Sequence, residues 1–214
     1  MKKVYFIAGL GADRRAFNFL DLSFCEPIFI EWIPPMPEET LQSYALRLFT
    51  SINDEKATIV GLSFGGMLAT EMAIAYPATT VIIISSAKTF KEIPAYLRFW
   101  RKLPVYKYVS NNSMKLSGGI VLRILGARGK QQQQLQQEII KSSNPSFTRW
   151  AMDAIVRWRN EIVPGNVTHI HGIADKLLPY RYVKANHTII DGEHVMVMDR
   201  APELSELLRQ LIIK

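Results

Sequence analysis

The sequence predicts an α/β fold, with a mostly parallel sheet of about six strands and a mostly helical insertion near its middle. Three observations lead to this prediction. Short runs of β-branched residues recur without polar alternation, which is typical of strands buried on both faces of a parallel sheet. Helical patterns separate these runs. Between residues 88 and 164 the runs stop, and only helical stretches and turns are recognisable.

The expected elements alternate along the chain. Strands are expected at residues 4–8, 27–31, 57–60, 81–84, 167–171 and 188–190. Helices are expected at residues 41–51, 64–76, 147–158 and 202–212, and the glutamines at 131–134 are expected to open another helix. Pro77 ends the second of these helices, and Asn144-Pro145-Ser146 is the start signal of the third.

The composition indicates a self-sufficient globular protein. The chain has 214 residues, of which 48% are hydrophobic and 21% charged, which excludes a disordered chain. The single cysteine, Cys25, cannot form an intramolecular disulfide and is interpreted as a reduced core residue. Residues 1–10 resemble a signal peptide, but the charged residues 13–15 follow where a cleavage site would lie. Because no apolar run is long enough to cross a membrane, we expect a cytoplasmic protein with no membrane partner.

The formal net charge of +7 is concentrated in the middle of the chain. Residues 88–160 contain 14 lysines and arginines but only three acidic residues, so their net charge is +11, whereas the rest of the chain is net negative. This asymmetry indicates either an anionic substrate or partner, or a solvated helix surface without a specific role. A nucleic acid is not the expected partner, because the basicity belongs to one segment and not to the whole molecule.

Two weaker candidate sites involve glycines and histidines. Gly9-Leu10-Gly11 follows the first expected strand, with Glu31 about 20 residues on, which is part of a dinucleotide-binding fingerprint. Arg14 stands where the third glycine is needed, so an NAD-dependent oxidoreductase is only a weak alternative. His169 and His171 lie two apart on an expected strand, a spacing known in metal sites. Their other interpretation is two strand histidines with satisfied hydrogen bonds, and we expect neither a metal nor a cofactor.

The favoured site centres on Gly61-Leu62-Ser63-Phe64-Gly65-Gly66, between an expected strand and an expected helix. This is the setting in which Gly-x-Ser-x-Gly forms a nucleophile elbow. The sharp turn strains the serine backbone, and the flanking glycines remove side chains that would clash. The N-terminus of the following helix offers free N–H groups to a developing oxyanion.

A nucleophilic serine needs a base and a group that orients the base, and both follow later strands. Asp175 lies four residues beyond the strand expected at 167–171, and His194 lies four residues beyond the last expected strand. Parallel sheets build their sites beyond the carboxyl ends of the strands. We therefore predict a catalytic triad of Ser63, Asp175 and His194. Glu193 and Asp199 are the acids that would replace Asp175 if the strand placement were wrong.

Through these residues the sequence resembles the α/β-hydrolase superfamily over nearly its whole length. The matching stretches are residues 61–66, 171–179 and 191–203. The resemblance implies the triad in the order Ser63, Asp175, His194, and a helical cap of residues 88–164 on a core of residues 1–87 and 165–214. It also implies an oxyanion hole. The family usually has His-Gly-x after its corresponding strand and this chain has Ala8-Gly9-Leu10, so the backbone N–H of Leu10 is expected to pair with that of Phe64.

The predicted function is a serine hydrolase that cleaves a carboxylic ester or thioester of a small molecule through an acyl-enzyme. Two alternatives keep the fold: a ligand-binding or receptor-like protein with slow or vestigial catalysis, and a non-hydrolytic enzyme (a lyase, or an enzyme that transfers the acyl group to an acceptor other than water) with the same triad. The substrate would be anionic if the basic segment surrounds the entrance to the site. Two interpretations are open for Phe99, Trp100, Tyr106, Phe147 and Trp150: they line an apolar acyl slot, or, as expected for most of them, they pack the cap against the core.

Overall fold

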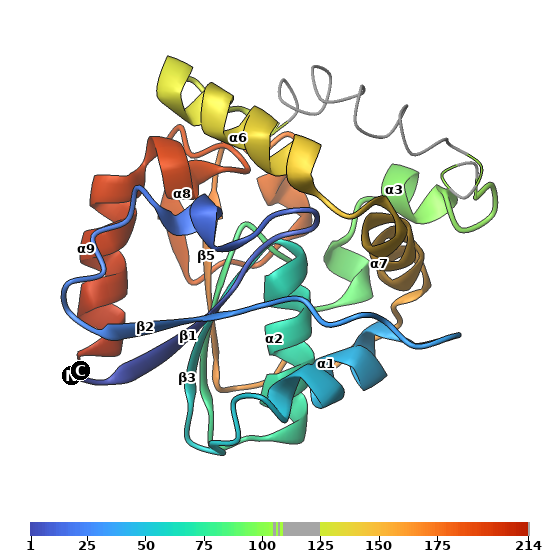
Figure 1. Ribbon diagram of the computed structural model, residues 1–214, viewed down its shortest axis with the longest axis horizontal. Helices are drawn as coiled ribbons and strands as arrows, with labels where there is room; N and C mark the ends of the chain where they lie inside the picture. Colours follow the sequence, from blue (N-terminus) through green and yellow to red (C-terminus); the bar gives the residue numbers. More distant parts are fainter. Residues whose placement is uncertain (105, 107, 109–124, 214) are drawn as a thin grey trace.

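The computed structural model describes residues 1–104, 106, 108 and 125–213, which form a six-stranded sheet with helices around it (Figure 1). The strands are β1 (Lys3–Ile7), β2 (Glu26–Ile30), β3 (Thr58–Leu62), β4 (Thr80–Ile84), β5 (Val167–Gly172) and β6 (His187–Ile189). Their order in the sheet is β2-β1-β3-β4-β5-β6, and all neighbours are parallel. The predicted α/β fold class is confirmed, and each strand lies within two residues of its predicted position.

The predicted helices are also present. The α-helices are α1 (Leu41–Phe49), α2 (Phe64–Ala75), α3 (Ala95–Phe99), α6 (Lys130–Ser142), α7 (Pro145–Arg157), α8 (Met196–Asp199) and α9 (Ala201–Ile212). Short 3₁₀ turns are η1 (Arg14–Phe17), η2 (Phe90–Glu92) and η4 (Tyr180–Tyr182). Asn144 caps α7 as predicted, since its side chain accepts hydrogen bonds from the N–H groups of Ser146 and Phe147. In the described part of the chain, no helix combines the length and the hydropathy that crossing a bilayer requires.

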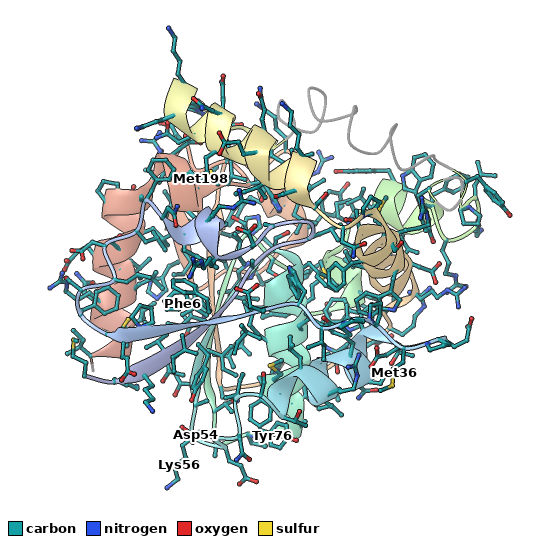
Figure 2. The ribbon with its side chains drawn as sticks, viewed as in Figure 1. Phe6, Met36, Asp54, Lys56, Tyr76 and Met198 are labelled. Atoms are coloured by element: carbon teal, nitrogen blue, oxygen red, sulfur yellow. The ribbon has the colours of Figure 1, made fainter. Side chains whose placement is uncertain are left out.

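Helices cover both faces of the sheet, which explains why the strands are apolar at successive positions (Figure 1). Tyr5 and Ile7 of β1 belong to the core beneath α1 and α2. The intervening Val4 and Phe6 belong to the core on the other face, with η1, α8 and α9; Phe6 is labelled in Figure 2. The lone Cys25 is buried in this second core, as predicted.

The middle segment, residues 88–164, contributes η2, α3, α6 and α7 between β4 and β5, and none of its described residues is in a strand. Helix α6 contacts η1 (Figure 1). At this contact the Arg15 Nη2 group donates a 2.5 Å hydrogen bond to Ser142 Oγ. Helix α7 packs against α1, and its residues Phe147 and Trp150 contact Phe64 of α2. The division of the chain into a core and a cap at residues 88 and 164 stays a prediction.

Candidate active site

The strand order creates a switch point between β1 and β3. After β1 the chain runs to β2 on one side, and it then returns to β3 on the other side; parallel sheets build their sites beyond the carboxyl ends of the strands at such a point. The opposite end of the sheet is marked by Asp54 and Lys56, which are labelled in Figure 2. A Cβ atom placed on Gly9, just after β1, would lie 3.4 Å from the Cβ atom of Ser63, just after β3. The two loops are therefore in contact.

Ser63 occupies a strained turn between β3 and α2, as predicted. Its backbone has φ 51° and ψ −115°, a conformation that non-glycine residues rarely adopt. The Ser63 N–H donates to Ile84 O at 2.9 Å, and Ser86 Oγ donates to Ser63 O at 2.6 Å. A Cβ atom on Gly65 would lie 2.3 Å from the carbonyl oxygen of Ala8, so only glycine lets α2 begin this close to β1.

Ser86 is a structural part of this turn that the sequence analysis missed. Its hydroxyl fixes the carbonyl group of Ser63, and its side chain also fills the space beside Gly66. The signal that could have found Ser86 is its place directly beyond the strand predicted at 81–84, at the carboxyl edge of the sheet.

The structure brings the three predicted triad side chains together. Ser63 Oγ lies 2.9 Å from His194 Nε2, and His194 Nδ1 lies 2.8 Å from Asp175 Oδ2. Asp175 and His194 are each only 3% exposed. A carboxylate can only accept a hydrogen bond, so the His194 proton sits on Nδ1 and leaves Nε2 free to accept the proton of Ser63. This arrangement can turn a serine hydroxyl into a nucleophile.

Asp175 is held as a carboxylate despite its burial. Its Oδ1 atom accepts the N–H groups of Leu177 at 2.9 Å and Leu178 at 2.8 Å. Burial raises the pKa of Asp175, but the His194 imidazole and the Leu178 N–H outweigh burial, so the pKa lies below its ordinary value. The Oδ1 atom of Asp175 therefore binds the loop that carries this residue, and the Oδ2 atom contacts His194.

The loops that carry Asp175 and His194 contact each other through their backbones. The N–H of Ala174 donates to Gly192 O at 3.0 Å, and the N–H of Ile173 donates to Ile189 O at 3.1 Å. A Cβ atom on Gly172 would lie 2.1 Å from Gly192 O, so a side chain at position 172 would push the loops apart. This close approach sets the distance between the acid and the base.

The two alternative acids have partners other than His194. Glu193 forms ion pairs with Arg128 at 2.8 Å and with Lys176 at 3.3 Å. Asp199 accepts the backbone N–H of Arg128 at 3.2 Å. Asp175 is therefore the acid that contacts His194.

The loop after β1 offers one of the two predicted oxyanion donors. The Ala12 N–H donates to Gly9 O at 3.0 Å, and Gly11 has φ 69°, which closes a tight turn with Leu10 at its first inner position. Trp32 Nε1 anchors the turn by donating to Ala12 O at 2.7 Å. Within the part of the chain that the structure describes, no hydrogen bond occupies the backbone N–H of Leu10 or of Phe64.

The weaker candidate sites acquire other roles in the structure. The glycines after β1 lead into the 3₁₀ turn η1, which contains Arg14, and not into the α-helix whose N-terminus a dinucleotide site requires; Glu31 is exposed. His169 and His171 are fully buried and contact each other, with His169 Nε2 and His171 Nδ1 3.0 Å apart. Residues 1–104, 106, 108 and 125–213 contain no group of three or more His, Cys, Asp or Glu side chains that could hold a metal ion.

The five aromatic residues considered for an acyl slot have three different environments. Phe147 and Trp150 of α7 pack on Phe64, the neighbour of Ser63, with ring centroids 6.4 Å and 6.1 Å away. Phe99 and Trp100 are instead 56% and 41% exposed. Tyr106 is buried, and its hydroxyl donates to Asp153 Oδ1 at 2.7 Å (the helix α7 carboxylate).

Comparisons with known proteins agree with the fold. No family model matches the sequence, and no curated protein matches it. The chain is similar to the solved structure of a thermophilic esterase from Thermogutta terrifontis, with 15% identity and a TM-score of 0.78 over 98% of this chain and 89% of that one. It is also similar to the enol-lactonase from Burkholderia xenovorans LB400, with 12% identity and a TM-score of 0.76 over 100% and 92% of the chains. A third similar structure is a carboxylesterase of Nitrososphaera gargenis, with 16% identity and a TM-score of 0.71 over 99% and 90%.

Proposed function

We propose that this chain, which has the α/β-hydrolase fold, is a serine hydrolase that cleaves carboxylic esters or thioesters. The observation that carries the proposal is the continuous hydrogen-bonded path from Ser63 through His194 to Asp175. The strained backbone of Ser63 and the position of the path at the switch point support it. Two of the similar structures are an esterase and an enol-lactonase, which are enzymes of ester chemistry.

In the acylation half of the reaction, Ser63 Oγ attacks the acyl carbon while His194 Nε2 takes the hydroxyl proton. The carbonyl oxygen gains negative charge, and the N–H groups of Leu10 and Phe64 donate to it. Asp175 stabilises the imidazolium that forms and keeps its orientation. His194 then gives the proton to the leaving alcohol or thiol, and the acyl group stays on Ser63 as an ester.

Deacylation repeats these steps with water in place of the serine hydroxyl. His194 takes a proton from the water as its oxygen attacks the acyl-enzyme, and the same two N–H groups hold the oxyanion. Collapse of the intermediate releases a carboxylic acid, and the proton returns from His194 to Ser63. The cycle balances with the substrate and water alone.

The basic middle segment supports a narrower proposal, which is that the acyl substrate is anionic. Several of its charges are already paired, since Lys91 contacts Glu161, Arg128 contacts Glu193 and Arg157 contacts Asp153. The exposed basic residues of the segment include Arg101, Lys102, Lys130 and Lys141. Lys107, Lys115 and Arg123 lie outside the described residues.

The experiment that tests the proposed function is a panel of acyl esters and acyl thioesters of graded chain length, assayed with wild type and Ser63→Ala. The substitution should lower kcat/KM for every cleaved substrate by about 10⁴-fold or more, because it removes the nucleophile. The unfolding temperature should stay close to that of wild type. Activity retained in a clean Ser63→Ala preparation would overturn the proposal.

A further inference from the structure

The pair His169 and His171 on β5 continues the triad into the protein interior, behind Asp175. His171 Nε2 lies 2.8 Å from the carbonyl oxygen of Leu178 and 3.5 Å from Asp175 Oδ2. The same Leu178 residue donates its N–H to Asp175 Oδ1 at 2.8 Å. His171 therefore contacts the carbonyl group of the same residue, Leu178, whose N–H binds the catalytic carboxylate.

The hydrogen bonds determine which nitrogen of each ring carries a proton. A carbonyl oxygen can only accept, so His171 Nε2 carries a proton and donates it to Leu178 O. In neutral His171 the Nδ1 atom is then an acceptor, and His169 Nε2 must donate to it across 3.0 Å. His169 Nδ1 is left without a proton, and it has no hydrogen-bond partner among the described residues.

The same reasoning shows why the pair does not transfer protons. If His171 took a second proton on Nδ1, His169 would have to present an unprotonated Nε2, and its own proton would move to Nδ1. That buried N–H would face no acceptor in the described structure, which is costly. Burial also lowers the pKa of His169 to about 2, and burial lowers the pKa of His171 as well. Both rings therefore stay neutral while the enzyme works.

We propose that His171, with its tautomer fixed by His169, is a positioning residue that orients Asp175 toward His194. It does so by holding the Leu178 carbonyl, which fixes the loop whose two N–H groups bind Asp175 Oδ1, and by presenting an N–H beside Asp175 Oδ2. This inference rests on the proposed function, because it gives His171 a role in catalysis through Asp175.

Nitrogen NMR of the wild-type histidine rings tests the proton assignment without any substrate or variant. His169 and His171 should both carry their single proton on Nε2 from neutral to mildly acidic pH. A single proton on Nδ1 of His171, or a charged ring in either residue, would overturn the proposal. This measurement does not depend on whether Ser63 is a nucleophile.

Variants then test the positioning role. His171→Phe keeps a ring of similar size but removes the donor; the matched control is His187→Phe, one strand away, where the histidine takes no part in these hydrogen bonds. His171→Phe should lower kcat of the folded enzyme by about tenfold to a hundredfold, as when a residue that orients a metal-binding side chain is removed, with KM little changed. His171→Gln, whose amide can still donate, should restore part of the loss.

The low-field proton resonance of the His194 Nδ1–H···Asp175 hydrogen bond distinguishes a positioning role from a purely structural role. It should be present in wild type, in Ser63→Ala and in His187→Phe, and weakened or shifted in folded His171→Phe. An unchanged resonance and kcat in folded His171→Phe would refute the positioning role. Activity retained by Ser63→Ala would instead refute the proposed function, so the two failures are distinguishable.

Discussion

The start of α2 after Ser63 depends on close contacts between main-chain atoms, whereas the carboxylate of Asp175 is held by hydrogen bonds, although its loop also has a close backbone contact between Gly172 and Gly192. The Ser63 turn fits because Gly65 lets α2 approach within a few ångströms of the Ala8 carbonyl. On the acid side, the N–H groups of Leu177 and Leu178 and the ring of His171 hold the carboxylate and its loop. The turn at Ser63 therefore has no room for a side chain at Gly65, and the orientation of the Asp175 carboxylate depends on the donors around it.

This difference means that the two sides should fail in different ways. A steric change at the Ser63 turn should affect folding, because backbone atoms cannot move aside one at a time. A polar change beside Asp175 should affect the reaction first, because the loop keeps its other hydrogen bonds. The predictions below test this contrast, beginning with the largest expected effect.

The largest effect is expected from Asp175→Asn, which should lower kcat by about 10⁴-fold because an amide can turn its NH₂ group toward His194 and favour the wrong tautomer. Steady-state kinetics on the best ester of the panel measures this change, together with the unfolding temperature. A fully active variant, or a variant that fails to fold, would contradict the proposed difference between the Ser63 turn and the Asp175 loop.

The next effect is on stability. Gly65→Ala should lower the free energy of unfolding by about 3–5 kcal/mol, because its Cβ atom would lie 2.3 Å from Ala8 O. The matched control is Gly165→Ala, where an added Cβ atom meets nothing within 4 Å and the change should stay within about 0.5 kcal/mol. Urea denaturation of both variants measures the difference, and equal stabilities would contradict the steric account of the turn.

The pH dependence of stability sharpens the description of the acid side. Burial lowers the pKa of His169 to about 2, so below pH ~6.5 the unfolded chain takes up a proton there and the folded protein does not. Stability should therefore rise with pH between about 2 and 6.5, and acidification should cost up to about 1.4 kcal/mol per pH unit. Denaturation between about pH 4 and 6 should show a smaller slope in His169→Phe than in wild type. Identical slopes would show that His169 is not held neutral.

The smallest effect is expected from Glu193→Gln, next to the base. Its ion pair with Arg128, whose side chain is 53% exposed, is worth less than about 1 kcal/mol, and kcat should stay within about threefold of wild type. Measuring kcat of Glu193→Gln and of Asp175→Asn on the same ester compares the two acids directly. A loss as large as that of Asp175→Asn would mean that Glu193, and not Asp175, is the acid on which His194 depends.

The sequence was sufficient where a feature is local. The glycines from Gly61 to Gly66 lie within one turn, and the β-branched runs mark strands that are covered on both faces, so both could be predicted. Asp175 and His194 could be predicted because each follows a strand that ends at the same edge of the sheet.

Other features depend on contacts between distant segments. Ser86 reaches Ser63 only because β4 lies beside β3 in the sheet, and the backbone contact of Gly172 with Gly192 requires β5 beside β6. The link from His171 to Leu178 involves a carbonyl group, which every residue has and which leaves no mark in a sequence. The short helices α3 and α8 do not contain enough turns to show a helical period.

The central claim is that Ser63 is an activated nucleophile, and reaction with a fluorophosphonate tests it most directly. Intact-protein and peptide mass spectrometry should show rapid addition of one phosphonyl group to Ser63 in wild type, much slower addition in Asp175→Asn, and none in Ser63→Ala. No addition to wild type, or addition at a site other than Ser63, would contradict the claim.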